Sequence, residues 1–182
     1  LHLTKKITTK HLVICYVKKM MKKIILLPIL ICFAAFTSCQ KTDVPQGTIE
    51  LNLNKYGKQF SIYVPDTLKE KLEVKEQSWG ALEIKIGKRF YISITEDPGD
   101  IVLLKSDIQS NDVNVFKAYI IDEPQTLLWE SYIVKPEYHF YTIQKAAGNT
   151  YVFQDVVPAD GEPFSKEAIE NMYHCSKQLI EK

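Results

Sequence analysis

The side chains that could do chemistry in this 182-residue chain are few and scattered. His174 and Cys175 are adjacent, but neighbouring helical residues project about 100° apart, which makes them a poor pair of zinc ligands. Cys175 falls inside a predicted helix and not at its start, where a thiol's pKa would fall, and no serine lies in a G-x-S-x-G turn. We therefore expect no metal site and no catalytic residue, with Cys175 in the core and His174 in solvent. The remaining histidine beyond residue 38 is His139.

Acidic residues gather in two short segments, 95–100 and 157–163. The first lacks the alternating acid spacing of a calcium-binding loop, and capping of the helix that follows explains Asp97 and Asp100 more simply. The second is typical of a turn before a helix. The glycines are isolated, so a phosphate-binding loop is not expected, and neither is any cofactor. A pair of carboxylates of the kind that hydrolyses glycosides stays open, because nothing in the sequence selects one.

A third reactive side chain, Cys39, ends a conspicuous apolar run. Lys22 and Lys23 precede 13 largely apolar residues, 24–36, and small residues follow before Cys39. A helix that crosses a bilayer needs about 20 apolar residues, so this run is short for a permanent span. Its three-part layout is typical of a secretory signal.

The four residues before and at this cysteine, FTSC, resemble the lipobox of bacterial lipoproteins, with Phe36 where Leu is usual. The resemblance implies that Cys39 is acylated, that the signal is cut just before it, and that the protein is anchored to a membrane. An uncleaved signal anchor and an ordinary secretory signal are the alternatives. The expected organisation is an upstream leader that is not translated, a signal peptide, a linker and a single domain, at residues 1–20, 21–38, 39–47 and 48–182.

The residue after the cysteine, Gln40, is not the acidic residue that retains a lipoprotein at the inner membrane in enteric bacteria. We therefore expect an outer-membrane anchor with the domain facing the periplasm or the cell surface. Residues 39–182 hold 16 basic and 22 acidic residues, a net charge of −6, with Arg89 as the single arginine. Such a domain is a poor candidate for binding nucleic acid, phosphates or anionic lipid headgroups. Cys175 is its single cysteine beyond Cys39, so an internal disulfide is excluded.

The elements that must position these residues are mostly strands. Alternating apolar residues predict one hairpin within residues 48–65 and a second within 81–97, whose inward side chains are Leu82, Ile84, Ile86, Phe90, Ile92 and Ile94. Four more strands are predicted at 114–122, 126–134, 138–145 and 150–157, the last two joined by a tight loop at 146–149. These last two strands are apolar on both faces, which is typical of strands covered above and below.

Two helices are predicted. The first is capped by Asp97 with Pro98 at its first position, and Ile101, Leu104 and Ile108 form its apolar stripe. The second extends from Ser165, its cap, to the end of the chain. Its apolar stripe comprises Ala168, Ile169, Met172, Tyr173, Ser176, Leu179 and Ile180. A short helical turn is also expected within residues 65–74. The predicted fold class is α+β, an antiparallel β-sheet with helices packed on it.

The order hairpin, hairpin, helix, strand meander, helix resembles the PsbP-like α/β/α sandwich, a superfamily that includes small bacterial envelope lipoproteins of the DcrB kind. The segments that carry the resemblance are FSIYVPD, DEPQTLLWESY, YHFYTIQKAAGNTYVFQDVVP and FSKEAIENMYHCSKQLI. It covers most of the chain after Cys39 but rests on pattern. It implies non-catalytic roles as assembly accessories and binding modules, and it transfers no catalytic residue to this chain.

The expected function is therefore that of a lipid-anchored cell-envelope protein with a non-catalytic binding or accessory domain and an envelope protein as partner. A small hydrolase that uses a carboxylate pair is one alternative. A carrier of a small apolar ligand, held in a cavity lined by Phe140, Tyr141 and Met172, is another. Aromatic side chains that could stack on a ligand are plentiful, although most are expected to fill the core; they include Trp79, Trp129, Tyr132, Tyr138, Tyr141, Tyr151 and Tyr173.

Overall fold

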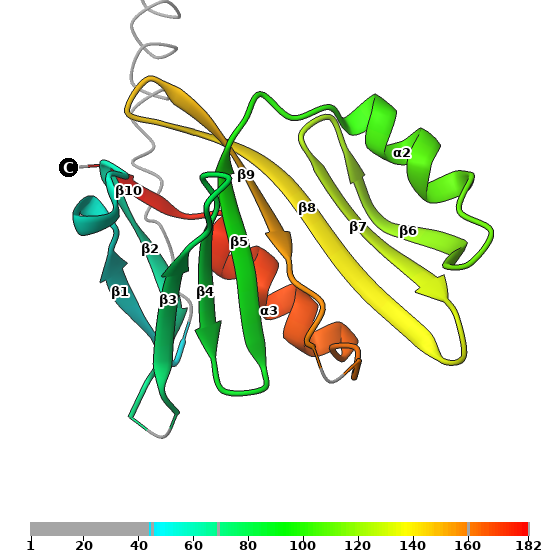
Figure 1. Ribbon diagram of the computed structural model, residues 1–182, viewed down its shortest axis with the longest axis horizontal. Coiled ribbons are helices and arrows are strands. Elements are labelled where there is room, and N and C mark those ends of the chain that lie inside the picture. The colour runs from blue at the N-terminus through cyan, green and yellow to red at the C-terminus, as the bar shows by residue number, and fades with distance from the viewer. Residues whose placement is uncertain (1–43, 45, 69, 160, 182) are drawn as a thin grey trace, which may run out of the picture. The chain divides into compact units, whose positions relative to one another are not determined.

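Two antiparallel sheets and two α-helices form the part of the chain that the computed structural model describes, residues 44, 46–68, 70–159 and 161–181 (Figure 1). The leader, the signal peptide and Cys39 lie outside these residues. The larger sheet has the order β3 (Leu72–Glu76), β4 (Leu82–Ile86), β5 (Phe90–Glu96), β9 (Asn149–Asp155), β8 (Pro136–Ala146), β7 (Thr126–Tyr132) and β6 (Val115–Glu123). The smaller sheet has the order β1 (Thr48–Asn52), β2 (Phe60–Pro65) and β10 (Leu179–Glu181). The α+β class predicted from the sequence is confirmed.

The core lies between the larger sheet, the smaller sheet and α3 (Lys166–Ser176). The six side chains of β4 and β5 that were predicted to face inward are each at most 2% exposed. They meet Phe60, Ile62 and Val64 of β2 and the buried stripe of α3, which includes Ile169 and Met172. In Figure 1, α3 lies behind β5 and β9.

The second helix, α2 (Ile101–Gln109), lies against the opposite face of the larger sheet. Successive side chains of a strand point to opposite faces. On β8, Phe140 belongs to the core beside α3, whereas His139 borders a cavity that residues of α2 also line. The prediction that the central strands are apolar on both faces is confirmed at β9, where Val152 and Phe153 are both buried although they face opposite ways.

The turn between β8 and β9 fixes the register in which these two strands pair, and this pairing positions the side chains on the face that α2 covers. Its connection is the two-residue turn Ala147-Gly148, and both residues have positive φ, 50° and 82°. Such a turn matches the right-handed twist of the flanking strands, so it holds the pairing tightly. Tyr141 is consequently paired with Gln154, which brings the end of β9 beside the first half of β8.

The predicted last helix is too long. α3 begins after Ser165, whose side chain accepts a hydrogen bond from the Ala168 backbone N–H as expected, but it ends at Ser176. Leu179 and Ile180, which were placed on the helical stripe, instead belong to β10 and pair with β2. Pairing with the free edge of β2 offers these residues backbone hydrogen bonds and a place beside the core that a longer helix would not provide.

Two smaller predictions are also wrong. The cap of α2 is Asp100, not Asp97, and its carboxylate accepts the backbone N–H groups of Val102 and Leu103. The segment expected to form a helical turn, 65–74, instead ends in the first residues of strand β3, which pairs with β4. Within the described residues, no helix combines the length and apolar character needed to cross a membrane.

Candidate functional site

A small cavity opens between α2 and strands β7 and β8, and one of the residues that line it, His139, lies between two carboxylates. Its volume is about 240 Å³. It is lined by Leu104, Asp107, Ile108, Asn111, Asn114, Trp129 and His139. Trp129 lies opposite His139 across the β7–β8 pairing, and their rings stack with centroids 5.2 Å apart. The indole therefore forms one wall of the cavity and limits the rotation of the imidazole.

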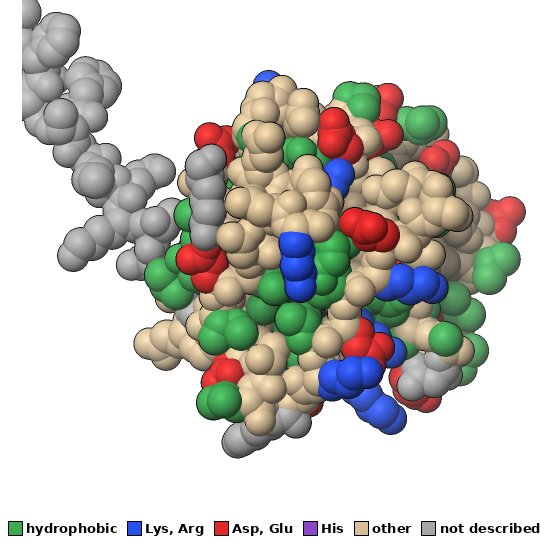
Figure 2. Space-filling view, turned by 60° about the vertical axis from the view of Figure 1, so that its left-hand side comes forward, with side chains coloured by type: hydrophobic (Ala, Val, Ile, Leu, Met, Phe, Trp, Pro, Cys, Tyr) green, Lys and Arg blue, Asp and Glu red, His purple; other side chains and the backbone are tan. Residues whose placement is uncertain are grey.

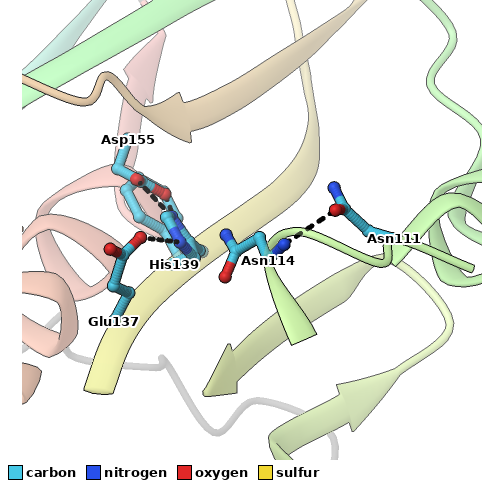
Figure 3. Close-up of polar contacts among 6 residues, drawn as sticks. Asn111, Asn114, Glu137, His139 and Asp155 are labelled. Atoms are coloured by element: carbon cyan, nitrogen blue, oxygen red, sulfur yellow. Dashed lines mark hydrogen bonds and ion pairs between the residues drawn. The ribbon is translucent and has the colours of Figure 1, made fainter. Parts of the chain in front are cut away.

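His139 lies between two carboxylates (Figure 3). Its Nδ1 is 2.9 Å from Oδ2 of Asp155, which is contributed by the last residue of β9. Its Nε2 is 3.8 Å from Oε2 of Glu137 on its own strand. The Asp155 carboxylate is itself anchored, because its other oxygen accepts the Phe140 backbone N–H at 2.8 Å. The imidazole orientation is thus determined from both sides.

The surroundings of His139 favour its protonated form. Burial alone would lower the pKa of this histidine, because desolvation disfavours a charge. The hydrogen bond to Asp155 and the negative charges of Asp155 and Glu137 act in the opposite direction and prevail, so the pKa of His139 is raised above its ordinary value. His139 therefore lies between two acids that favour its protonated form, in which both ring nitrogens are hydrogen-bond donors.

Two polar atoms at this cavity are buried without a hydrogen-bond partner among the described residues. They are Nε2 of His139 and the side-chain oxygen Oδ1 of Asn114. Asn114 is held in place through its backbone, since the N–H groups of Val113 and Asn114 both donate to Oδ1 of Asn111. Figure 3 shows the Asn114 amide directed toward His139. A buried polar atom without a partner is costly, so these two atoms mark a place where a ligand could be bound.

The cavity is therefore lined by two residues that each have a polar atom without a hydrogen-bond partner among the described residues, next to an aromatic wall. A protonated Nε2 donates, and the Asn114 amide oxygen accepts. A ligand group that carries both functions, such as a peptide or carboxamide group or a hydroxyl, satisfies the two atoms together. In the part of the chain that the structure describes, no group of three or more His, Cys, Asp and Glu side chains could hold a metal ion.

The reactive residues singled out from the sequence do not come together. Cys175 is fully buried, as predicted, and burial raises the pKa of its thiol to about 12. His174 is exposed, also as predicted, and stacks on Tyr173. Cys39, the predicted lipid-attachment residue, lies outside the described residues. Asp97 accepts the Gly99 backbone N–H, so it stabilises the turn before α2.

The three residues proposed to line an apolar cavity do not share one. Phe140 and Met172 are fully buried in the core beside α3. Tyr141 lies on the opposite face of β8, where its hydroxyl is close to the residues that precede α2. The sequence reasoning noted His139 but missed its partners. The tight loop after Ala146 could have identified Asp155. In a hairpin with a two-residue turn, residues at equal distances from the turn pair with each other, so the end of β9 lies beside residues 139 and 140.

Comparisons of the chain with protein-family models, with curated proteins and with solved structures found no match. The likeness to PsbP-like envelope lipoproteins therefore stays a prediction from the sequence pattern.

Proposed function

We propose that this protein is a lipid-anchored cell-envelope protein, held in the outer membrane through Cys39, whose PsbP-like domain binds an envelope protein without catalysing a reaction. The observation that carries the binding role is the His139 cavity. There Nε2 of His139 and Oδ1 of Asn114 are buried without a hydrogen-bond partner among the described residues, next to an aromatic wall. The peptide group of a partner protein has the complementary acceptor and donor in one unit. The anchor rests on the signal-like run that ends at Cys39.

The geometry favours binding over hydrolysis by a carboxylate pair. The fold brings the acids Glu137 and Asp155 to the candidate site, but they lie on either side of an imidazole and not across an open cleft. Both oxygens of Asp155 accept hydrogen bonds from the protein. His139 is in turn held between these two acids, its Nδ1 2.9 Å from Asp155 and its Nε2 3.8 Å from Glu137. Hydrolysis stays the alternative that the experiments below are designed to detect.

The anchor is tested by replacing Cys39 with serine in the full-length chain. The variant is expected to leave the membrane fraction and to lose incorporation of a labelled fatty acid, because serine lacks the thiol that accepts the lipid. Cys32→Ala, a change within the same signal, is the matched control and is expected to behave like the wild type. If Cys39→Ser protein stays in the membrane with its label and its length unchanged, the anchor is refuted.

Binding is tested by affinity capture of the anchored protein from its own envelope. We expect a protein partner whose recovery falls at least about tenfold for His139→Phe, since a buried hydrogen-bond donor and its charge are lost. His174→Phe, the exposed histidine, is the matched control and is expected to retain the partner. Capture of nothing by the wild type, together with turnover of a panel of glycoside and ester substrates, would favour the hydrolase.

A further inference from the structure

The start of β1 identifies the end of the domain to which the linker is joined. Thr48 pairs with Pro65, and the Gly47 carbonyl accepts the Asp66 backbone N–H at 2.9 Å. The linker therefore reaches the domain beside the loop between β2 and β3. The β2–β3, β4–β5, β7–β8 and β9–α3 loops lie at this same end of the molecule, along the lower edge of Figure 1.

These loops are joined to one another by side-chain contacts. Arg89, in the β4–β5 turn, donates to Glu70 of the β2–β3 loop at 2.8 Å. The same turn shares a cavity of about 290 Å³ with Pro158 and Pro163 of the β9–α3 loop. That loop is connected to the β7–β8 loop by the ion pair of Lys135 and Glu162. We call this continuous surface the linker rim; its described residues are 66–68, 70–71, 87–89, 133–135, 156–159 and 161–165.

The linker rim exposes aliphatic side chains at its tips. Leu68 is 88% exposed, Val134 82%, Val157 56% and Ile133 46%. The loops at the other end of the strands are different. Among their described residues, 53–59, 77–81, 97–100, 124–125 and 147–148, Trp79 is the single exposed large hydrophobic side chain. Exposed aliphatic side chains on loop tips are removed from water only when another apolar surface covers them, and that removal is favourable.

We propose that the linker rim rests on the lipid bilayer, with Leu68, Val134 and Val157 inserted at the boundary between headgroups and acyl chains. This inference rests on the proposed lipid anchor. The linker from Cys39 to Gly47 spans nine residues, so even fully extended it reaches only about 30 Å. It joins the domain at the rim itself, which keeps these side chains at a high effective concentration at the surface of the membrane.

The contact is apolar rather than electrostatic. The described residues of the linker rim carry nearly balanced charges, the bases Lys71, Lys88, Arg89 and Lys135 and the acids Asp66, Glu70 and Glu162. Figure 2 shows acidic, basic and hydrophobic side chains interspersed on the neighbouring face as well. A surface of this kind is not attracted to anionic lipids in particular. Each aliphatic side chain that moves from water into the acyl boundary strengthens the contact roughly three- to tenfold. Docking is therefore expected on neutral membranes as well as on charged ones.

The test uses the full-length lipidated protein, purified from membranes and returned to vesicles of phosphatidylcholine. Single cysteines are introduced as Leu68→Cys and Val134→Cys, with Trp79→Cys at the opposite end as the matched control, and each is labelled with a fluorophore. Labelling is specific because Cys39 is acylated and the Cys175 thiol is buried with its pKa raised to about 12. Vesicles with bromine atoms in the acyl chains quench a fluorophore that lies in the bilayer.

We expect quenching at positions 68 and 134 to exceed that at position 79 by at least about twofold, because loop tips at the interface reach about 5–10 Å into it. The result should be the same when a third of the lipid is anionic phosphatidylglycerol. Equal quenching at all three positions, or quenching that requires the anionic lipid, overturns the proposal. Iodide added to the water quenches fluorophores that are exposed to solvent. If the fluorophore at position 134 is protected from iodide but is not quenched by the brominated lipids, a protein covers the rim, and the proposal is overturned as well.

The mass of the Cys39 peptide reports on the anchor separately. An acylated protein whose labels at 68 and 134 are not quenched overturns the docking of the rim and leaves the proposed anchor intact. A protein without acyl chains overturns both.

Discussion

The two helices pack on the larger sheet in very different ways. α3 buries Ile169, Met172, Tyr173, Cys175 and Ser176, and its face merges with the core. α2 buries only Ile108 among its residues and leaves Val102 79% and Leu103 58% exposed. Both helices have side-chain N-caps, so local sequence signals do not account for the contrast.

The contrast shows that the face beneath α3 forms the main core, whereas α2 covers its face less completely. Beneath α3, apolar side chains fill the space. Beneath α2 lies a cavity lined by His139, which is held between two acids, and by Asn114, whose side-chain oxygen has no hydrogen-bond partner among the described residues. A face with few buried apolar contacts opens at lower free energy, and elements that must admit ligands are drawn from such faces.

The largest expected difference between the faces is in packing. Met172→Ala should lower the free energy of unfolding by roughly 2–5 kcal/mol, because Met172 is fully buried and the truncation leaves a cavity. Leu103→Ala on α2 should change it by less than about 0.5 kcal/mol. Urea denaturation followed by circular dichroism measures both. Similar losses for the two variants would show that α2 belongs to the same cooperative core.

The next effect concerns His139 and depends on pH. The pKa of His139 is raised in the folded state, so the folded protein binds the proton more tightly than the unfolded chain does. The resulting stabilisation is fully present below the unfolded pKa of about 6.5 and is lost as the pH rises through the folded pKa. Wild-type stability in urea titrations should therefore fall as the pH rises above about 6.5, and it should fall by more than that of Asp155→Asn.

Asp155→Asn should also cost roughly 1–3 kcal/mol at about pH 6, because a charged acceptor of two buried hydrogen bonds is replaced by a neutral one. The control is His174→Gln, which changes an exposed imidazole and should retain the wild-type pH dependence. An unaltered pH slope in Asp155→Asn would mean that this carboxylate does not hold the proton on His139.

Removing the N-cap of each helix should have smaller effects, and these effects should differ between α3 and α2. Ser165→Ala should lower the global free energy of unfolding by about 1 kcal/mol. Asp100→Ala removes a carboxylate that accepts two backbone N–H groups, yet its main effect should be local. Hydrogen exchange monitored by mass spectrometry should show faster exchange across α2 with little change in α3. Equal loss of protection in both helices would contradict the distinction.

The smallest change is expected at the surface of α2. Val102→Ser replaces a side chain that is 79% exposed, so the free energy of unfolding should stay within about 0.5 kcal/mol of the wild type. The same denaturation assay measures it. A clear loss of stability would indicate that Val102 is covered in solution, which would turn attention to α2 as an interface.

The elements that could be predicted are those whose signal is local and repeated. The alternation in β4 and β5 identified six inward side chains correctly, and Ser165 was recognised as a cap because the serine precedes an amphipathic run. β3 and β10 were missed because both are short strands that exist through their pairing with β4 and β2. Asp97 and Asp100 differ by three residues in one turn, and Gly99, with φ at 66°, determines where the helix begins.

Only part of the candidate site could be predicted from the sequence. His139 could be read as a histidine on a strand, but its effect depends on Asp155, 16 residues away, and on Glu137. Asn114 carried no recognisable signal at all, because an asparagine before a strand is common in loops. The function of such residues comes from proximity across strands and from the loss of water around them, and neither is encoded in a local pattern.

Composition, the short apolar run before Cys39 and the period of the strands were sufficient for the fold class and for the prediction of an exported, acidic domain on a tether. They are properties of single residues and their immediate neighbours. The histidine between two acids, the cavity under α2 and the aliphatic rim beside the linker arise only when the chain folds, because pairing register and burial bring distant side chains within a few ångströms of each other.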